Sequence, residues 1–171
     1  MRALVLALVA SATWVASAAA GDGPAAQLNF LQGCWRGAFQ SEAGVTDNRC
    51  FQPMLGGQYV RDTHVVHNGA GPYSGETIYY LDAQTHQLSF TYFASDGGVM
   101  RGTGNVDESG IVFPPSQYIG SDGQALTLRS SWRRSGPDRF IAVTEMQEHE
   151  SWRPLHTIVY VRAQELSPPA Q

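Results

Sequence analysis

Ionisable side chains set into apolar, β-prone segments are the residues of this sequence that could carry chemistry. Glu145 lies within the apolar run 140–146, and Arg101 directly follows Val99-Met100. If the face of the strand that carries Glu145 is interior, its carboxylate needs a charged or hydrogen-bonding partner. Arg101 or Arg49 could supply that partner. The open alternative is that Glu145 lies on the outer face, beside solvent.

Aromatic residues on neighbouring β-prone segments would complete such an interior site. Tyr80, Tyr92 and Trp132 are expected to form its wall. A cavity with aromatic walls and a few polar groups suits binding of a small apolar or polar-headed molecule, or general acid–base chemistry on one. The expected ligand-binding residues are therefore Tyr80, Tyr92, Arg101, Trp132 and Glu145.

The histidines and the serine motifs do not match known metal or hydrolase patterns. His64 and His67 are three residues apart, so on a regular strand they point to opposite faces. The chain has no HExxH motif and no clustered Cys/His spacing. Residues 71–75 depart from the Gly-x-Ser-x-Gly spacing of a nucleophile elbow. We therefore expect no metal site, no cofactor and no catalytic residue.

The charge balance excludes several classes of function. The chain has a formal net charge of −4, a pI near 5.6 and no Lys, so that its 11 basic residues are all Arg. An acidic balance without a basic run argues against nucleic-acid binding. The absence of Lys excludes Schiff-base and P-loop chemistry.

Residues 1–20 are typical of a cleaved signal peptide. Arg2 gives a positive start, residues 3–15 form an apolar core, and an Ala-x-Ala site at 18–20 precedes Gly21. The apolar core is short for a membrane span. We therefore expect an exported protein, periplasmic or secreted, with no stable membrane insertion after cleavage; an uncleaved anchor is the alternative.

The remaining residues suit a single domain. We expect that domain over residues 21–165 and a disordered tail at 166–171, where prolines follow one another. In an exported protein, two cysteines predict one disulfide. Cys34 and Cys50 flank a turn-rich segment and lie opposite each other if the hairpin is centred near Glu42. Without a CxxC spacing, this bond is a structural staple.

The elements that must position these side chains are short strands. After a helical stretch at 24–31, turn residues punctuate β-prone runs throughout the chain. The fold class is therefore all-β: an antiparallel up-and-down meander of about 8–10 strands, closed into a barrel because closure removes exposed edges. An open sheet or sandwich is the alternative. Strands are expected near 34–40, 46–52, 57–67, 74–82, 87–95, 98–106, 110–113, 124–134, 138–147 and 156–163.

Short motifs at 30–37, 54–60, 78–82, 102–104 and 158–162 carry a family resemblance. Their order resembles bacterial lipocalin-like, calycin-type barrels of unknown function, the DUF1579-like family. The resemblance implies a lipocalin-like barrel with a short N-terminal helical turn.

The resemblance also implies roles for individual residues. Trp35 of the first strand would pack at the closed end of the barrel beneath Arg162 of the last strand. That role is structural, and a fold does not specify a function. A haem-binding relative of this barrel class, the nitrobindin type, uses a histidine near the end of the chain; His156 is the comparable residue, although the Gly-rich first-strand pattern of that type is absent.

Taken together, these features predict a binding module for a small, largely apolar molecule. One alternative is an enzyme of isomerase or cyclase type that uses carboxylates in the cavity. A second is a filled barrel that acts as a structural or interaction component of the cell envelope. Cavity volume separates the filled barrel from the other two. The oligomeric state is open.

Overall fold

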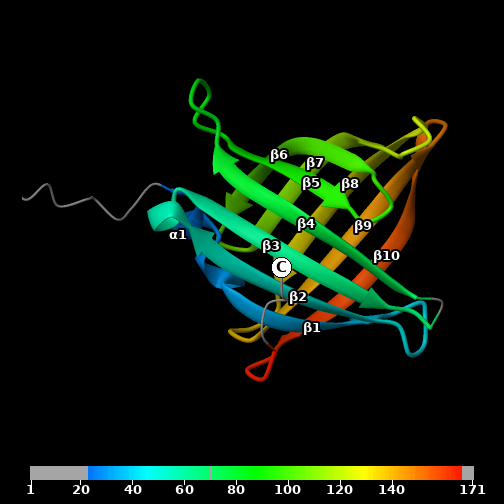
Figure 1. The fold of residues 1–171 in the computed structure, drawn as a ribbon, viewed down its shortest axis with the longest axis horizontal. Coiled ribbons are helices and arrows are strands. Elements are labelled where there is room, and N and C mark those ends of the chain that lie inside the picture. Colours follow the sequence, from blue (N-terminus) through cyan, green and yellow to red (C-terminus); the bar gives the residue numbers. More distant parts are fainter. Residues whose placement is uncertain (1–22, 70, 167–171) are drawn as a thin grey trace, which may run out of the picture.

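Each strand pairs antiparallel with the strands before and after it in the chain, and the first strand also pairs with the last. The computed structural model describes residues 23–69 and 71–166, and all structural statements below concern those residues. The pairing closes ten strands into a barrel (Figure 1), which confirms the predicted closed meander. The strands are β1 (Gly33–Phe39), β2 (Thr46–Met54), β3 (Tyr59–His67), β4 (Pro72–Leu81), β5 (Leu88–Ala94), β6 (Val99–Asp107), β7 (Gly110–Ile119), β8 (Ala125–Arg134), β9 (Arg139–Glu148) and β10 (Ser151–Arg162).

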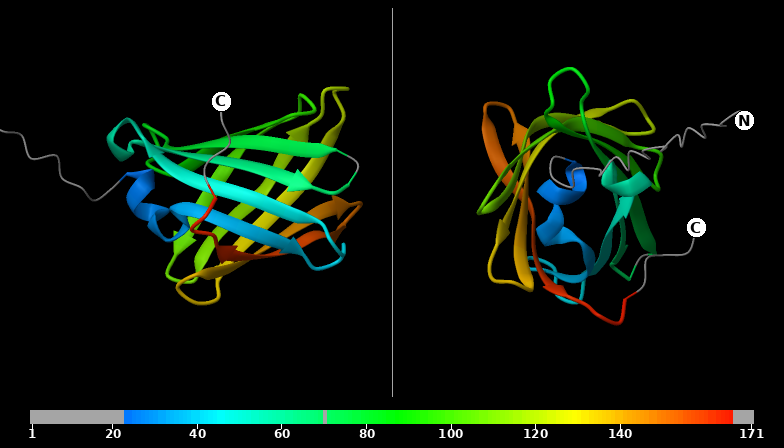
Figure 2. Two further views of the ribbon diagram at one scale, coloured as in Figure 1. Left: turned by 60° about the horizontal axis from the view of Figure 1, so that its bottom comes forward. Right: turned by 90° about the vertical axis from the view of Figure 1, so that its left-hand side faces the viewer.

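A short helical segment closes one end of the barrel. It consists of α1 (Pro24–Gln27) and the 3₁₀ turn η1 (Asn29–Leu31), and a further 3₁₀ turn, η2 (Leu55–Gly57), joins β2 to β3. Pro24 stands in the first turn, where its missing N–H costs no hydrogen bond. Leu28 and Leu31 are fully buried in the core. Figure 2 shows this segment lying across one opening of the barrel.

Trp35 and Arg162 fasten the closed end. They are register partners in β1 and β10, and the guanidinium carbon of Arg162 lies 4.2 Å from the centre of the Trp35 ring. Arg162 Nη1 donates to the main-chain carbonyl of Gln32 at 2.7 Å, and its Nε donates to Asp138 at 2.8 Å. Trp35 Nε1 donates to the carbonyl of Leu31 at 2.7 Å. These bonds tie the helical segment to the seam of the barrel.

Two strands are longer than expected because prolines do not end them. β7 continues through Pro114-Pro115 to Ile119, and β10 begins at Ser151 rather than near residue 156. The register of β7 with β8 shifts between Phe113 and Ser116, and that of β10 with β9 shifts between Pro154 and His156. The irregularity leaves Pro114 and Pro115 without register partners on β8, whereas Pro154 still pairs with Glu145 and the irregularity follows it. Each strand then resumes beyond its proline.

Aromatic rings fill much of the barrel between the closed end and its middle. Phe140 stacks on Tyr160 with ring centres 4.5 Å apart and meets Trp35 edge-on at 4.8 Å. Phe113 meets Trp132 edge-on at 5.0 Å. Contacts of this kind add about 0.5–1.5 kcal/mol per pair beyond the burial of apolar area. Trp132 therefore lies on the inner face of β8.

The predicted disulfide is present on the outer face of the barrel. Cys34 and Cys50 are register partners in β1 and β2 and are bonded to each other. Their neighbours Trp35 and Arg49 point inward, so the alternation of the strands directs both sulfur atoms outward. The bond therefore clamps the first hairpin without occupying the interior.

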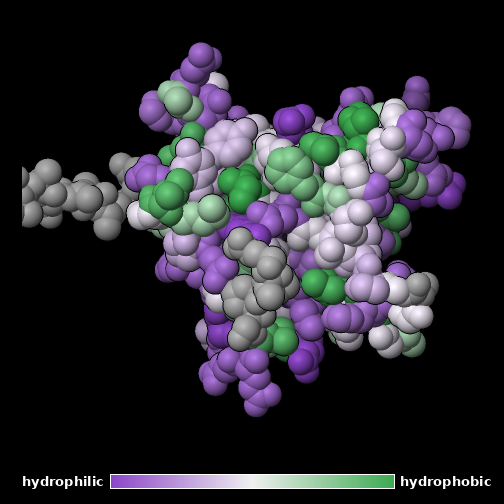
Figure 3. Space-filling model, viewed as in Figure 1, coloured by the Kyte–Doolittle hydropathy of each residue, from purple (hydrophilic) through white to green (hydrophobic). Residues whose placement is uncertain are grey.

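The outer surface is largely hydrophilic on the face seen in Figure 3, where apolar residues are scattered among polar ones. Of the helices described here, none has the length and apolar character needed to cross a membrane. The predicted signal peptide at 1–20 and residues 167–171 of the predicted tail lie outside the described residues.

Candidate functional site

The barrel encloses a cavity of about 380 Å³ on the side of the core away from α1. Its wall reaches from Trp132 in the middle of the barrel to the hairpin and turn residues Glu42 and Asn68 at the opposite end. Most of the wall is aromatic or aliphatic, including Phe39, Val66, Phe90, Phe113, Leu128 and Ile158. Polar side chains are concentrated on one side, on β2 to β5.

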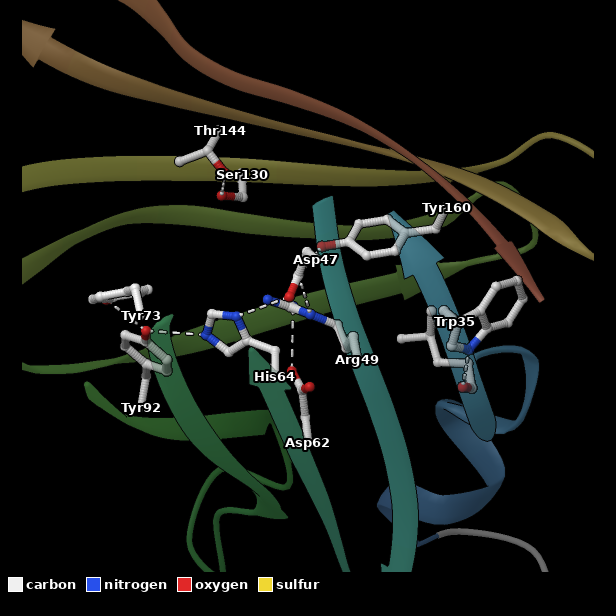
Figure 4. A network of polar contacts seen from close by, with 11 residues as sticks. Trp35, Asp47, Arg49, Asp62, His64, Tyr73, Tyr92, Ser130, Thr144 and Tyr160 are labelled. Carbon is white, nitrogen blue, oxygen red and sulfur yellow. Dashed lines mark hydrogen bonds and ion pairs between the residues drawn. The ribbon is translucent and has the colours of Figure 1, made fainter. Parts of the chain in front are cut away.

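The polar wall arises from the alternation of β2 and β3. Asp47 and Arg49 are two residues apart on β2, and Asp62 and His64 are two residues apart on β3, so each pair shares the inner face of its strand. Arg49 is the register partner of His64. The antiparallel pairing therefore brings four ionisable side chains together inside the barrel, a group that we call the buried charge cluster (Figure 4).

Arg49 contacts two carboxylates and two aromatic rings. Its Nε lies 3.3 Å from Asp47 Oδ2, and its Nη1 lies 3.3 Å from Asp62 Oδ2. The rings of Trp132 and Tyr160 lie 5.1 Å and 5.7 Å from the guanidinium carbon. The side chain of Arg49 is 12% exposed and both carboxylates are 1% exposed. Buried charges of this kind are tolerated because they are paired and hydrogen-bonded.

The two carboxylates of the cluster differ in their protonation chemistry. Burial raises the pKa of Asp47, but Arg49, the His64 ring and the Tyr160 hydroxyl together hold that pKa below its ordinary value. Burial dominates at Asp62 and raises its pKa, although Arg49 opposes the shift. Asp47 is therefore the firmly ionised member, and Asp62 is the member that protonates more readily.

A hydrogen-bond chain runs from the cluster along the cavity wall. Asp47 Oδ1 accepts from the His64 ring at Nδ1, 3.3 Å away, and His64 Nε2 lies 3.1 Å from the Tyr92 hydroxyl. The Tyr92 hydroxyl lies 2.7 Å from that of Tyr73. Burial raises the pKa of Tyr92, so this phenol stays protonated. We call this series, Asp47–His64–Tyr92–Tyr73, the relay (Figure 4).

Gly75 makes room for the relay. It is the register partner of His64 on β4, between β3 and β5. A Cβ atom at this position would lie 2.3 Å from the Tyr92 hydroxyl and 2.6 Å from His64 Nε2. Any side chain at residue 75 would therefore force the imidazole and the phenol apart.

The opposite wall carries a second, smaller polar group. Ser130 on β8 and Thr144 on β9 place their hydroxyls 2.9 Å apart on the cavity wall. His156 also lines the cavity, meets Phe39 edge-on at 5.4 Å, and its buried Nδ1 has no hydrogen-bond partner among the described residues. Burial lowers the pKa of His156, with Glu42 opposing the shift, so its imidazole is held neutral.

The structure separates the five expected ligand-binding residues into two sets. Tyr92 and Trp132 line the cavity. Tyr80, Arg101 and Glu145 do not, and the interior orientation expected for these three is wrong. Each is next to an inward-facing residue, namely Tyr79, Met100 and Thr144. A shift of one residue reverses the face of a strand position, and this is the error made here.

Glu145 has a partner other than the two considered from the sequence. On the outer face, its carboxylate forms a bidentate pair with Arg129, at 2.6 and 3.0 Å. The Glu145 side chain is 28% exposed, and that of Arg129 is 40% exposed. The expected pairing of Glu145 with Arg101 or Arg49 is therefore wrong, and its partner is Arg129.

The sequence analysis missed the buried charge cluster as a unit, although a signal for it exists. Asp47 and Arg49 share a strand face with Phe51, whereas Cys50 lies on the other face. Asp62 and His64 similarly alternate in phase with Val60 and Val66. Charged residues in phase with buried apolar ones on two consecutive strands predict an interior ion-pair cluster.

Among the described residues, no group of three or more His, Cys, Asp and Glu side chains is arranged to hold a metal ion. The polar wall can instead do two things: donate and accept hydrogen bonds with a ligand in the cavity, and hold an imidazole oriented by a carboxylate next to two phenols. The first supports recognition, and the second supports proton transfer.

Comparisons with known proteins support the fold but assign no function. The crystal structure of Rv2717c from M. tuberculosis is similar, with a TM-score of 0.57 and 18% sequence identity, covering 83% of this chain and 99% of that chain. No family model matches the chain, and a search of curated proteins found no match. At this level of identity, the likeness establishes a shared barrel architecture alone.

Proposed function

We propose that the protein binds a small, largely apolar molecule within the barrel. The observation that carries this proposal is the cavity of about 380 Å³, with mostly aromatic and aliphatic walls and hydrogen-bonding groups concentrated on one side. Sites for small ligands typically have volumes of about 300–1,000 Å³ and this mixture of apolar wall and few polar groups. The cavity also argues against a barrel filled by its own side chains.

The compartment and the family form part of the same proposal. The disulfide between Cys34 and Cys50 is the kind of bond that persists in oxidising compartments. It supports an exported protein, periplasmic or secreted, as the signal-like residues 1–20 suggest. The barrel topology similarly supports the lipocalin-like, DUF1579-like assignment made from the motifs. Cell fractionation, with N-terminal sequencing of the mature chain, tests export directly.

A second candidate function is proton-transfer catalysis of the isomerase type. The relay favours it, because Asp47 orients the His64 imidazole and two phenols extend from that imidazole along the cavity wall. The carboxylate is thus Asp47 and not Glu145. Exchange of solvent deuterium into the carbon next to a ketone probe, followed by NMR, tests for this activity; His64→Gln abolishes the exchange if the relay carries it.

The binding proposal is tested by identifying what the protein carries. Native mass spectrometry of the protein from its own cells, with an absorbance spectrum of the same sample, should show an extra mass that is lost on denaturation. A Soret band would instead identify haem, the alternative raised by His156. A bare chain that also fails to bind an apolar probe, tetralin, in calorimetry would overturn the proposal.

A matched pair of variants localises the binding. Ser130→Phe places a ring in the cavity, so it should abolish tetralin binding. Ser131→Phe introduces the same ring at the next position of β8, on the outer face, and should leave tetralin binding unchanged. Equal effects of the two substitutions would place the bound probe elsewhere.

A further inference from the structure

The charge of the cavity wall limits which ligands it accepts. Arg49 is the one Arg or Lys among the described residues that line the cavity. Its Nε and Nη1 already face carboxylates, and its guanidinium carbon lies near the rings of Trp132 and Tyr160. A ligand carboxylate would therefore compete with Asp47 and Asp62 for a guanidinium that they already neutralise. Placing a third carboxylate against this cluster carries the full cost of burying an unpaired charge.

The relay reaches the Tyr73 hydroxyl on the cavity wall, which also faces the Tyr118 hydroxyl, and Tyr118 donates to Asp96. The direction of the hydrogen bonds in the relay depends on one proton. With neutral His64, Nδ1–H donates to Asp47, so Nε2 accepts from Tyr92 and Tyr92 accepts from Tyr73. The oxygen of Tyr73, beside its contact with Tyr118, then acts toward a ligand as a hydrogen-bond acceptor. With protonated His64, Nε2–H donates to Tyr92. The hydrogen bond between the two tyrosines then reverses, so that Tyr92 donates to Tyr73 and Tyr73 donates to the ligand.

Charged and titratable groups surround the His64 imidazole. Negative and positive groups both face the imidazole, and they come from the neighbouring strands as well as from its own. The titratable and charged groups around it are Asp47 and Arg49 on β2, Asp62 on β3, Tyr73 on β4, Tyr92 on β5 and Tyr160 on β10.

An uncharged hydroxyl is the ligand group that satisfies the relay in both directions, because it both donates and accepts. A ketone satisfies the relay in one direction only, and a carboxylate adds charge that the wall does not neutralise. We propose that the cavity selects ligands whose polar group is a neutral alcohol or phenol and discriminates against the carboxylate of the same skeleton. This inference rests on the proposed ligand-binding function.

Four probes on one bicyclic skeleton test the selectivity by calorimetry: tetralin, 1-tetralol, 1-tetralone and 1,2,3,4-tetrahydro-1-naphthoate. We expect 1-tetralol to bind about three- to tenfold more tightly than tetralin, the gain of one net hydrogen bond. The carboxylate should bind more weakly than tetralin itself. 1-Tetralone should bind more weakly than 1-tetralol, because a ketone accepts a hydrogen bond but donates none.

Removal of the terminal hydroxyl isolates the relay from the apolar wall. Tyr73→Phe should reduce the affinity for 1-tetralol to that for tetralin and leave tetralin binding unchanged. Tyr80→Phe removes a hydroxyl from a residue outside the cavity lining and should change neither affinity. If Tyr73→Phe does not fold, Tyr92→Phe provides the second test: the Tyr73 hydroxyl loses its partner Tyr92 and can donate to a ketone, so 1-tetralone should approach 1-tetralol in affinity.

The outcomes separate the inference from the function on which it rests. If none of the four probes binds, both the binding function and the selectivity are overturned. If tetralin binds and 1-tetralol gains nothing, or if the carboxylate binds most tightly, the cavity is a binding site and the selectivity for a hydroxyl is wrong.

Discussion

The guanidinium carbon of Arg49 lies 5.1 Å from the centre of the Trp132 ring, so a buried cation rests on an aromatic face in the wall of the cavity. Arg49 also separates Asp47 from Asp62. Removing it would leave two carboxylates in the interior without a cation between them. Arg49→Met should therefore reduce the free energy of unfolding by about 3–5 kcal/mol, measured by urea denaturation.

A second arginine on the outside of the barrel provides the control for Arg49. Arg129 forms a bidentate pair with Glu145, but both side chains are partly exposed to water. Ion pairs exposed to water contribute little to stability, and the guanidinium carbon of Arg129 also lies 4.3 Å from the centre of the Trp152 ring. Arg129→Met should therefore lower the free energy of unfolding by clearly less than Arg49→Met in the same urea denaturation. If the two substitutions cost the same, the buried charge cluster does not depend on Arg49 for its stability.

Arg162 should be important for the stability of the closed end. Arg162→Gln removes a contact with the Trp35 ring and hydrogen bonds to the Gln32 carbonyl and to Asp138. We expect a loss of about 1–3 kcal/mol in the free energy of unfolding. Arg153→Gln changes a side chain that is 68% exposed and should have almost no effect. Unchanged stability of Arg162→Gln would show that the helical segment holds its place without this residue.

The disulfide should act by restricting the unfolded chain. Cys34 and Cys50 are 16 residues apart in the sequence, and closing a loop of that size stabilises by about 3 kcal/mol in the chain-entropy model. The double variant Cys34→Ala, Cys50→Ala should lose about that amount, and adding reductant to the unaltered protein should lower its melting temperature similarly. Since the bond is on the outer face, binding of tetralin at low temperature should persist.

His156 should make the protein less stable in acid. Its folded pKa lies below the ordinary value of 6.5 because burial disfavours the charged ring. Between the folded and the unfolded pKa, the unfolded chain binds more protons, so stability present at neutral pH is lost as the pH falls below about 6.5. Urea denaturation across this range should show a shallower slope for His156→Gln.

The matched control for His156 is His67→Gln, which alters an exposed histidine at the end of β3. It should keep the pH slope of the unaltered protein. A slope that persists in His156→Gln would assign the acid sensitivity to another group.

The barrel was predictable from the sequence because its signals are local. Turn residues occur at nearly every strand boundary, and alternation in segments such as 124–134 separates inner from outer residues. The strand expected near 110–113 stops short of Pro114-Pro115, and a proline lacks the N–H that a regular ladder needs. The structure shows that β7 bypasses the two prolines by an irregularity in its register, which a sequence pattern does not reveal.

The interior polar residues were harder to predict because both faces of some strands are apolar. On β9, Ile141 and Val143 share the outer face with Glu145, whereas Phe140 and Ala142 lie inside. Because alternate positions share a face of the strand, Glu145 was grouped with these aliphatic residues, but the pattern did not show which face was interior. The pairing of Arg49 with His64 depends on the register between strands, and that register emerges only when the sheet is assembled.

Closure between β1 and β10 also has a consequence for how the chain folds. Trp35 pairs with Arg162, so the first and last strands of the barrel must meet before either edge is covered. Contacts between residues so distant in sequence slow folding, because a long loop must be ordered before they form. During synthesis, the nine earlier strands are made before β10 can complete the ring. Until then, β1 and β9 present unpaired edges to other chains, and the nascent protein is most exposed to aggregation.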